Sequence, residues 1–198
     1  MVIKDEKMTA KLTHLEEKIH LHTFLKQAAS DDSIRLSFDR LQRMIPMEAS
    51  LVFLELSLGG SVKGKVYVRL NKDLPNTRDN FIHIVTGQQG PTLTGVKYNG
   101  HTSNYMYADT SSFGEMIFTR DRIERSKAKR GDLIGHFNYG YLKCLHFYVT
   151  TPPTTLDYGS PWTVFGHVEA GIDVVLECHD KHSSGVTVSD SGLVLEQE

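Results

Sequence analysis

VFGHVEAG, at residues 164–171, is the stretch of this 198-residue sequence that decides the fold. Its first half belongs to a strand candidate that runs from Thr163 to Val168. A helix is expected directly after it, from about Ala170 to Cys178, where apolar residues recur at helical spacing. The hydrophobic period therefore changes within a few residues, which indicates a strand that leads straight into a helix.

Further strands are expected on both sides of this stretch. Leu51–Leu56 and Lys65–Leu70 flank Gly59-Gly60 and predict a β-hairpin. A short helix from Thr77 to Val85 should follow, with Gly87 as its C-cap. The remaining strand candidates are Asn104–Ala108, Leu133–Phe137, Leu145–Val149 and Leu193–Leu195. Many short strands with two interspersed helices are typical of a closed barrel with capping helices.

The N-terminal segment has a different pattern. From Met8 to Ala29 large side chains recur in steps of three and four, which predicts one helix, and Ile34–Ile45 predicts a second that Pro46 ends. We therefore divide the chain into an N-terminal helical hairpin, residues 1–46, and a barrel domain, residues 51–198. The apolar stripe of the hairpin either packs on the barrel or docks on a protein partner.

The bulk properties exclude several classes of protein. The formal net charge of −2 offers no general attraction for nucleic acid or for acidic membranes. Cys144 and Cys178 form neither a disulfide framework nor a zinc pattern, so reduced thiols in an intracellular protein, cytoplasmic or nuclear, are expected. No apolar run approaches the roughly 20 residues that a membrane span needs.

Six stretches, taken in order along the barrel domain, resemble the cyclophilins, a family of peptidyl-prolyl isomerases. They are Phe53-Leu54-Glu55-Leu56, Gly64-Lys65-Val66, Leu74-Pro75-Asn76-Thr77 leading to Asn80-Phe81, Thr86-Gly87-Gln88-Gln89-Gly90, Phe147-Tyr148-Val149 and Val164-Phe165-Gly166-His167-Val168-Glu169-Ala170-Gly171. The resemblance implies a mostly β fold: an eight-stranded antiparallel barrel with two capping helices, here preceded by the helical hairpin.

The family's chemistry is electrostatic, and the resemblance implies which groups it needs. An X-Pro bond isomerises slowly because partial double-bond character must be broken. In cyclophilins an arginine guanidinium donates toward the prolyl nitrogen, and an apolar pocket holds the proline ring. Counting from Thr86-Gly87 and from Tyr105-Met106 places Gly100 on that arginine position. The resemblance therefore implies that this chain has no catalytic residue of the family's kind.

In the same register, eight residues are candidates for the peptide groove. They are Tyr105, Met106, Ala108, His136, Asn138, His146, Tyr148 and Trp162. Several are bulkier than their family counterparts, so the proline pocket is expected to be filled by its own walls. The aromatic residues could also be ordinary core packing, and the histidines could be structural.

These departures favour a protein-interaction or scaffold module, an inactive isomerase homologue that meets a protein partner through the groove or the N-terminal hairpin. The alternative is an active peptidyl-prolyl isomerase with a remodelled site, in which Lys97, His101 or His136 replaces the arginine. Neither function needs a cofactor.

Two other groups of residues are candidates for a functional site: a set of histidines and a cysteine that could bind a metal, and a run of basic residues. His20 and His22 would point about 200° apart on a helix and could not share a metal ion, and Cys178, His179 and His182 lack a second ligand pair, so no metal is expected. A basic run is formed by Arg120, Arg122, Arg125, Lys127, Lys129 and Arg130. It is either a solvated loop face or a docking site for an acidic partner or a nucleic-acid backbone, although no nucleic-acid motif accompanies it.

Overall fold

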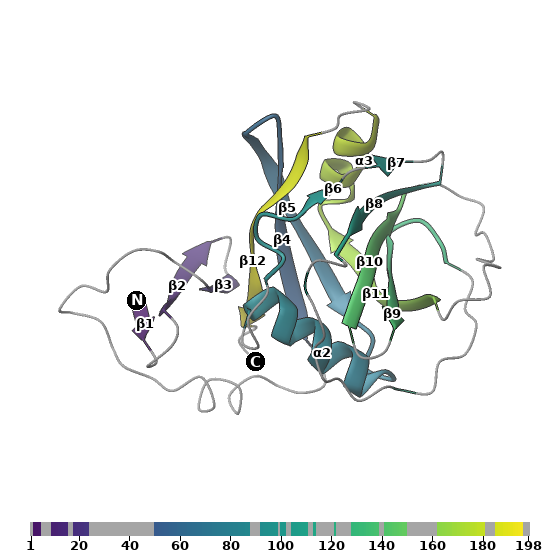
Figure 1. Ribbon diagram of the computed structural model, residues 1–198. Coiled ribbons are helices and arrows are strands. Elements are labelled where there is room, and N and C mark those ends of the chain that lie inside the picture. Colours follow the sequence, from purple (N-terminus) through teal and green to yellow (C-terminus); the bar gives the residue numbers. More distant parts are fainter. Residues whose placement is uncertain are drawn as a thin grey trace.

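The computed structural model shows one curved antiparallel sheet with two helices against it (Figure 1). The described residues are 2–4, 9–15, 18–23, 50–87, 92–98, 100–101, 104–110, 113, 121, 128–138, 141–149, 162–180 and 185–195. None of the helices within these ranges has the length and apolar character that a membrane crossing requires.

Within the described ranges the sheet has twelve strands. They are β1 (Val2–Lys4), β2 (Thr9–Leu15), β3 (Lys18–Thr23), β4 (Leu51–Leu58), β5 (Ser61–Leu70), β6 (Lys97–Tyr98), β7 (Gly100–His101), β8 (Tyr105–Asp109), β9 (Asp132–Asn138), β10 (Tyr141–Tyr148), β11 (Trp162–Ala170) and β12 (Val186–Leu195). The order is β1-β2-β3-β12-β4-β5-β11-β9-β10-β8-β7, and β6 pairs with β12. Every pairing is antiparallel.

This arrangement corrects the expected eight-stranded closed barrel. The hydrogen-bonded order is a path that ends at β7, not a ring, and the N-terminal strands extend it at the other end. The sheet nevertheless comes close to forming a ring. Strands β6 and β7 are separated by one residue in the sequence, and β6 pairs with β12 while β7 pairs with β8. One short segment thus joins the two sides of the curved sheet.

The two helices lie where the sequence predicts them. Helix α2 (Pro75–Thr86) ends at Gly87, whose φ of 61° provides the left-handed C-cap expected there. Its first turn is capped from a distance: the Asp121 carboxylate accepts hydrogen bonds from the backbone N–H groups of Asn76 and Thr77, at 3.2 and 2.7 Å. Helix α3 is Ile172–Asp180.

The main core fills the inside of the curved sheet. Phe81 of α2 meets Phe165 of β11 edge to face, with ring centroids 4.7 Å apart, and both side chains are fully buried. Phe165 belongs to the stretch that decided the fold, so the same residues that identify β11 also fasten a helix to it. Aromatic pairs of this geometry stabilise beyond the area that they bury.

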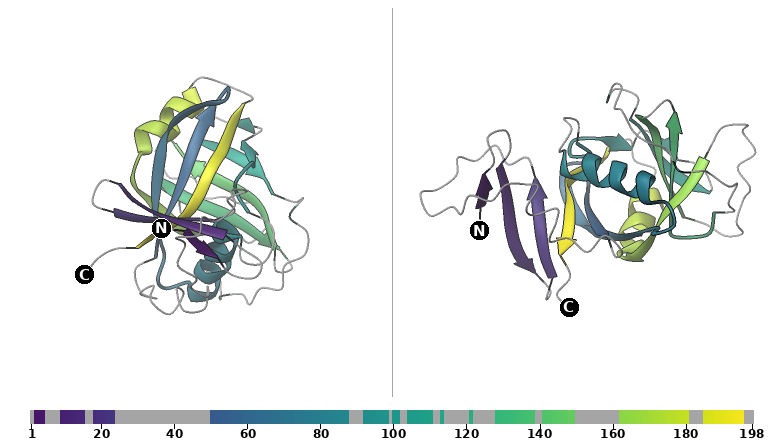
Figure 2. Two further views of the ribbon diagram at one scale, coloured as in Figure 1. Left: turned by 90° about the vertical axis from the view of Figure 1, so that its left-hand side faces the viewer. Right: turned by 90° about the horizontal axis from the view of Figure 1, so that it is seen from below.

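The helical prediction for the N-terminal segment is wrong where it can be compared. Residues 9–15 and 18–23 form the strands β2 and β3, while the second predicted helix, 34–45, lies outside the described residues. In Figure 2 these strands lie beside β12 and away from the rest of the sheet, as a hairpin that extends its edge. Pairing with β12 decides the conformation, since tertiary context overrides local pattern.

Gly192 on β12 makes the contact with β3 possible. It stands between His22 of β3 and Phe53 of β4 in one cross-strand row. A Cβ atom at position 192 would overlap the carbonyl oxygen of Leu21 and come within 3.0 Å of the Phe53 ring. The missing side chain therefore lets the His22 and Phe53 rings approach to 5.1 Å across β12.

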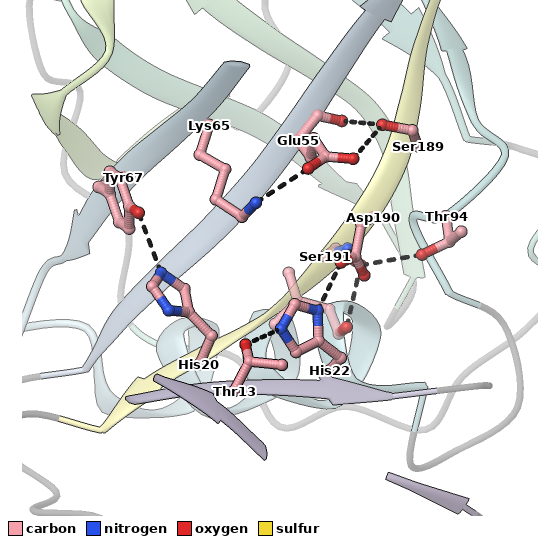
Figure 3. Close-up of polar contacts among 11 residues, drawn as sticks. Thr13, His20, His22, Glu55, Lys65, Tyr67, Thr94, Ser189, Asp190 and Ser191 are labelled. Atoms are coloured by element: carbon pink, nitrogen blue, oxygen red, sulfur yellow. Dashed lines mark hydrogen bonds and ion pairs between the residues drawn. The ribbon is translucent and has the colours of Figure 1, made fainter. Parts of the chain in front are cut away.

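Side-chain polar contacts on one face of the sheet hold the hairpin against its neighbours (Figure 3). His20 is fully buried, and its Nε2 lies 2.9 Å from the Tyr67 hydroxyl. The two ring nitrogens of His22 contact Asp190 at 2.5 Å and the Thr13 hydroxyl at 2.6 Å. These contacts tie β3 to β2, β5 and β12.

The expectation that His20 and His22 point in opposite directions assumed a helix, but both residues lie on strand β3. At positions i and i+2 of a strand their side chains share one face, and the ring centroids are 6.2 Å apart. Their ring nitrogens are nevertheless in hydrogen-bond contact with other side chains: His20 with Tyr67, and His22 with Asp190 and Thr13. In the part of the chain that the structure describes, no group of three or more metal-ligating side chains is assembled.

Candidate functional site

Five neighbouring strands place one residue each in a single row across the side of the sheet that faces away from the main core. Cross-strand pairs link Val164 to Ile134, Ile134 to His146, His146 to Tyr107, and Tyr107 to Gly100. Directly opposed residues of antiparallel strands point to the same side of the sheet. A side chain at position 100 would therefore lie on the same side as His146 and Tyr107.

Around this row lies a set of rings that we call the aromatic–histidine face. It comprises Tyr105, Tyr107, Ile134, His136, His146, Tyr148, Trp162 and Val164. The His146 ring is at its centre: it stacks on Tyr105 at 4.6 Å with an angle of 11°, and lies 4.4 Å from Trp162. The His136 ring also lies near Trp162, with centroids 5.2 Å apart.

The interior of this face is filled by its own side chains. Tyr148 is fully buried, Ile134 is 1% exposed and His146 is 5% exposed. Tyr105, Tyr107 and Trp162 are partly exposed and form its surface. A proline ring would have to displace buried aromatic groups, and closely packed interiors resist such displacement.

Two polar atoms of the face are left without partners. Among the described residues, His146 Nδ1 and Trp162 Nε1 are buried and make no hydrogen bond. Leaving a buried donor or acceptor unsatisfied costs about 1 to 3 kcal/mol. An unpaired polar group of this kind in a folded protein calls for a physical reason.

Burial also fixes the charge of His146. Desolvation lowers the pKa of His146 to about 3, and the neighbouring His136 contributes to this as the smaller cause. The imidazole is therefore neutral at physiological pH, and it can offer one acceptor nitrogen and one N–H donor. The face carries no formal charge at its centre.

The depressed pKa of His146 makes stability depend on pH. An unfolded histidine takes up a proton near its ordinary pKa of 6.5, whereas folded His146 stays neutral down to about 3. The unfolded state thus binds more protons between these values, and stability falls as the pH drops. His146→Phe should reduce the loss of unfolding free energy between pH 7 and pH 5 by ~2 kcal/mol, measured by denaturant titration. An unchanged difference between the two pH values would contradict this.

The structure separates the residues that the sequence analysis grouped as a groove. Tyr105, His136, His146, Tyr148 and Trp162 come together on the aromatic–histidine face.

Met106 and Ala108 do not join them, because they lie in the main core with 2% and 0% exposure. Side chains alternate along a strand, so Met106 and Ala108 must face away from Tyr105. Tyr107, which the sequence analysis passed over, takes the place on the face, and the i, i+2 spacing from Tyr105 was the signal that could have found it. Asn138 ends β9 opposite Tyr141, and its side chain lies outside the described set.

The basic run is described only at its end. Lys129 and Arg130 are exposed just before β9, whereas Arg120, Arg122, Arg125 and Lys127 lie outside the described residues. Asp121, an acidic residue within the run, caps helix α2. Burial opposes the ionisation of this carboxyl, but the hydrogen bonds from Thr77 and Asn76 outweigh it and lower the pKa of Asp121. Binding of an acidic partner by the run stays a prediction.

Comparison with known proteins agrees with the described architecture. No family model matches the sequence. The crystal structure of the Mimivirus cyclophilin is similar to this chain with a TM-score of 0.57 and 17% sequence identity, over 75% of this chain and 91% of that one. At this identity the likeness concerns the fold: a mostly β, antiparallel sheet with two helices, of cyclophilin type.

Proposed function

We propose that this chain is a cyclophilin-like protein-interaction module that does not catalyse prolyl isomerisation, and that the aromatic–histidine face is its binding surface. The observation that carries the proposal is the row that ends at Gly100. Gly100 pairs with Tyr107 in that row, it stands on the position that the resemblance assigns to the family's arginine, and glycine supplies no side chain there.

The filled interior of the face supports the same conclusion. A prolyl isomerase needs both a donor aimed at the twisted amide and a cup for the proline ring. Here Tyr148 and His146 are buried within the face. Removing one well-placed donor from a site of this kind costs a hundredfold to a thousandfold in rate, and a blocked cup adds to that loss.

The alternative, an active isomerase with a remodelled site, needs a substitute donor. Lys97 pairs with Thr187 on β12, outside the row that leads to His146. His136 does belong to the face, beside Trp162. It is the substitute that a positive isomerase assay would first implicate, and His136→Phe would then abolish the activity.

We expect the protein to leave the cis-trans exchange rate of a proline-containing tetrapeptide unchanged. Exchange spectroscopy on one NMR sample measures the rate and also reports peptide-induced shifts of the protein. A cyclophilin of known activity is the positive control for the peptide.

The variant Gly100→Arg tests the two parts of the argument separately. It should remain inactive, because the arginine alone does not reopen the proline cup. Exchange accelerated by the unmodified protein would sink the proposal, whereas shifts without acceleration support a binding module.

A further inference from the structure

We infer that Thr13, His22 and Asp190 form a catalytic triad, which transfers an acyl group from a small, uncharged ester first to the Thr13 hydroxyl and then to water. The Thr13 hydroxyl lies 2.6 Å from His22 Nε2, and His22 Nδ1 lies 2.5 Å from a carboxylate oxygen of Asp190 (Figure 3). This site is built on the N-terminal hairpin and β12. It is independent of the binding role proposed for the aromatic–histidine face.

The partners of His22 determine where its proton lies. An ionised carboxylate can only accept hydrogen bonds, so His22 Nδ1 carries the proton that Asp190 accepts. In the neutral imidazole Nε2 is then an acceptor, and the Thr13 hydroxyl donates to it. The lone pairs of the Thr13 oxygen stay available for attack on a carbonyl carbon. Nucleophile, general base and orienting carboxylate therefore stand in the relation that Ser-His-Asp catalysis uses.

Three strands bring the triad together and hold its base in place. Thr13 is on β2, His22 on β3 and Asp190 on β12. The other oxygen of the Asp190 carboxylate accepts the Ser191 backbone N–H at 2.8 Å. The imidazole of His22 meets the Phe53 ring edge to face, with centroids 5.1 Å apart. The base is thus oriented before a substrate arrives, which lowers the entropic part of the barrier.

The triad is accessible from solvent. Thr13 is partly exposed, and the side chains of His22 and Asp190 are 13% and 27% exposed. Strand β1 pairs with β2 no further than Lys11, so within the described ranges no strand lies beyond β2 at Thr13. A half-covered base leaves room for a small acyl group, and the Asp190 carboxylate disfavours an anionic substrate. A neutral acetyl ester meets both conditions.

The reaction needs only the ester and water. The Thr13 oxygen bonds to the acyl carbon while its proton passes to His22 Nε2. The bond from that carbon to the alcohol oxygen then breaks, and His22 gives the proton to the departing alcohol. Water attacks the acyl-threonine in the same way: it loses a proton to His22, which returns one to the Thr13 oxygen as the carboxylic acid leaves.

Acetylation of Thr13 by p-nitrophenyl acetate tests the triad on the whole protein. After an acid quench, trypsin releases residues 12–18, in which Thr13 is the only residue with a hydroxyl group. We expect this peptide to carry an acetyl group that hydroxylamine removes, because hydroxylamine cleaves esters but leaves lysine amides. Nitrophenolate release should be about tenfold or more faster than from Thr13→Val, since general-base catalysis contributes roughly a hundredfold or more.

Further variants separate catalysis from structure. Thr13→Ser keeps the hydroxyl and should retain acetylation, whereas His22→Gln should lose it. Asp190 is a positioning residue: Asp190→Asn favours the wrong tautomer of the imidazole, so kcat should fall by about tenfold or more while KM stays unchanged. Thr187→Val on β12 is the matched control, because Thr187 is a partly exposed strand threonine that contacts no described histidine. Its rate should equal that of the unmodified protein.

Each outcome decides for or against the triad. An unmodified protein that gains no acetyl group at Thr13 overturns it, and so does unchanged acetylation in His22→Gln. Amide hydrogen exchange at residues 19–22 shows whether β3 is still paired in each variant. If His22→Gln detaches the hairpin, Thr13→Ser and Thr13→Val decide between them, and equal rates of nitrophenolate release overturn the triad.

Discussion

Replacing Gly192 with alanine should detach the β2–β3 hairpin from β12 and lower the free energy of unfolding by about 2 to 4 kcal/mol. The new Cβ would overlap the Leu21 carbonyl oxygen, which belongs to a backbone that cannot move while β3 stays paired. Detachment would expose His20 and Leu21, both fully buried. Denaturant titration gives the free energy, and amide hydrogen exchange at residues 19–22 shows whether the hairpin has separated.

Gly60→Ala is the matched control for this variant. Gly60 lies in the turn between β4 and β5 with a φ of +82°, and a Cβ there would meet open space. A left-handed backbone alone costs about 1 to 2 kcal/mol, so this variant should lose less stability and keep the protection of residues 19–22. Full protection of the hairpin in Gly192→Ala would refute the steric explanation.

Phe165→Ala should have the other large effect, a loss of about 3 to 5 kcal/mol in the free energy of unfolding. The side chain is fully buried and meets Phe81 of α2 with ring centroids 4.7 Å apart. Alanine would leave a cavity between the sheet and the helix. Thermal or urea unfolding, followed by circular dichroism, measures the loss.

If the alanine variant does not fold, Phe165→Leu provides a second measurement. It keeps most of the apolar volume and should cost less than about 1.5 kcal/mol. Val62→Ala is the surface control, since Val62 is 57% exposed and its truncation removes no core contact. A Phe165→Ala protein as stable as Val62→Ala would show that the helix does not depend on this ring pair.

The sequence analysis predicted the elements whose own residues determine them. The strand expected at Thr163–Val168 is the middle of β11, and the helices expected at Thr77–Val85 and about Ala170–Cys178 are α2 and α3 within a few residues. In each case the hydrophobic period, a capping glycine or a proline near the helix start is local information. Such signals are present before any tertiary contact is known.

The errors lie where a distant partner decides. Residues 18–23 have a pattern compatible with a helix, but they form a strand that pairs with β2 on one side and with β12, at Gly192, on the other. Met106 and Ala108 were counted among the peptide-groove candidates from the family register, whereas strand alternation places them in the core once Tyr105 faces outward. Asp121 caps a helix that begins more than forty residues earlier in the chain, at a spacing that no motif describes.

The position of β12 has a consequence for synthesis. His22 and Asp190 are in contact although they are 168 residues apart in the chain. At about 5 to 20 residues per second, roughly 10 to 30 s separate their appearance at the ribosome. Strands β3, β4 and β6 all pair with β12. The nascent chain therefore carries unpaired strand edges until β12 arrives, and edges of that kind are templates for aggregation. Chaperone demand should be greatest in this interval, and a ribosome stalled before Val186 would prolong it.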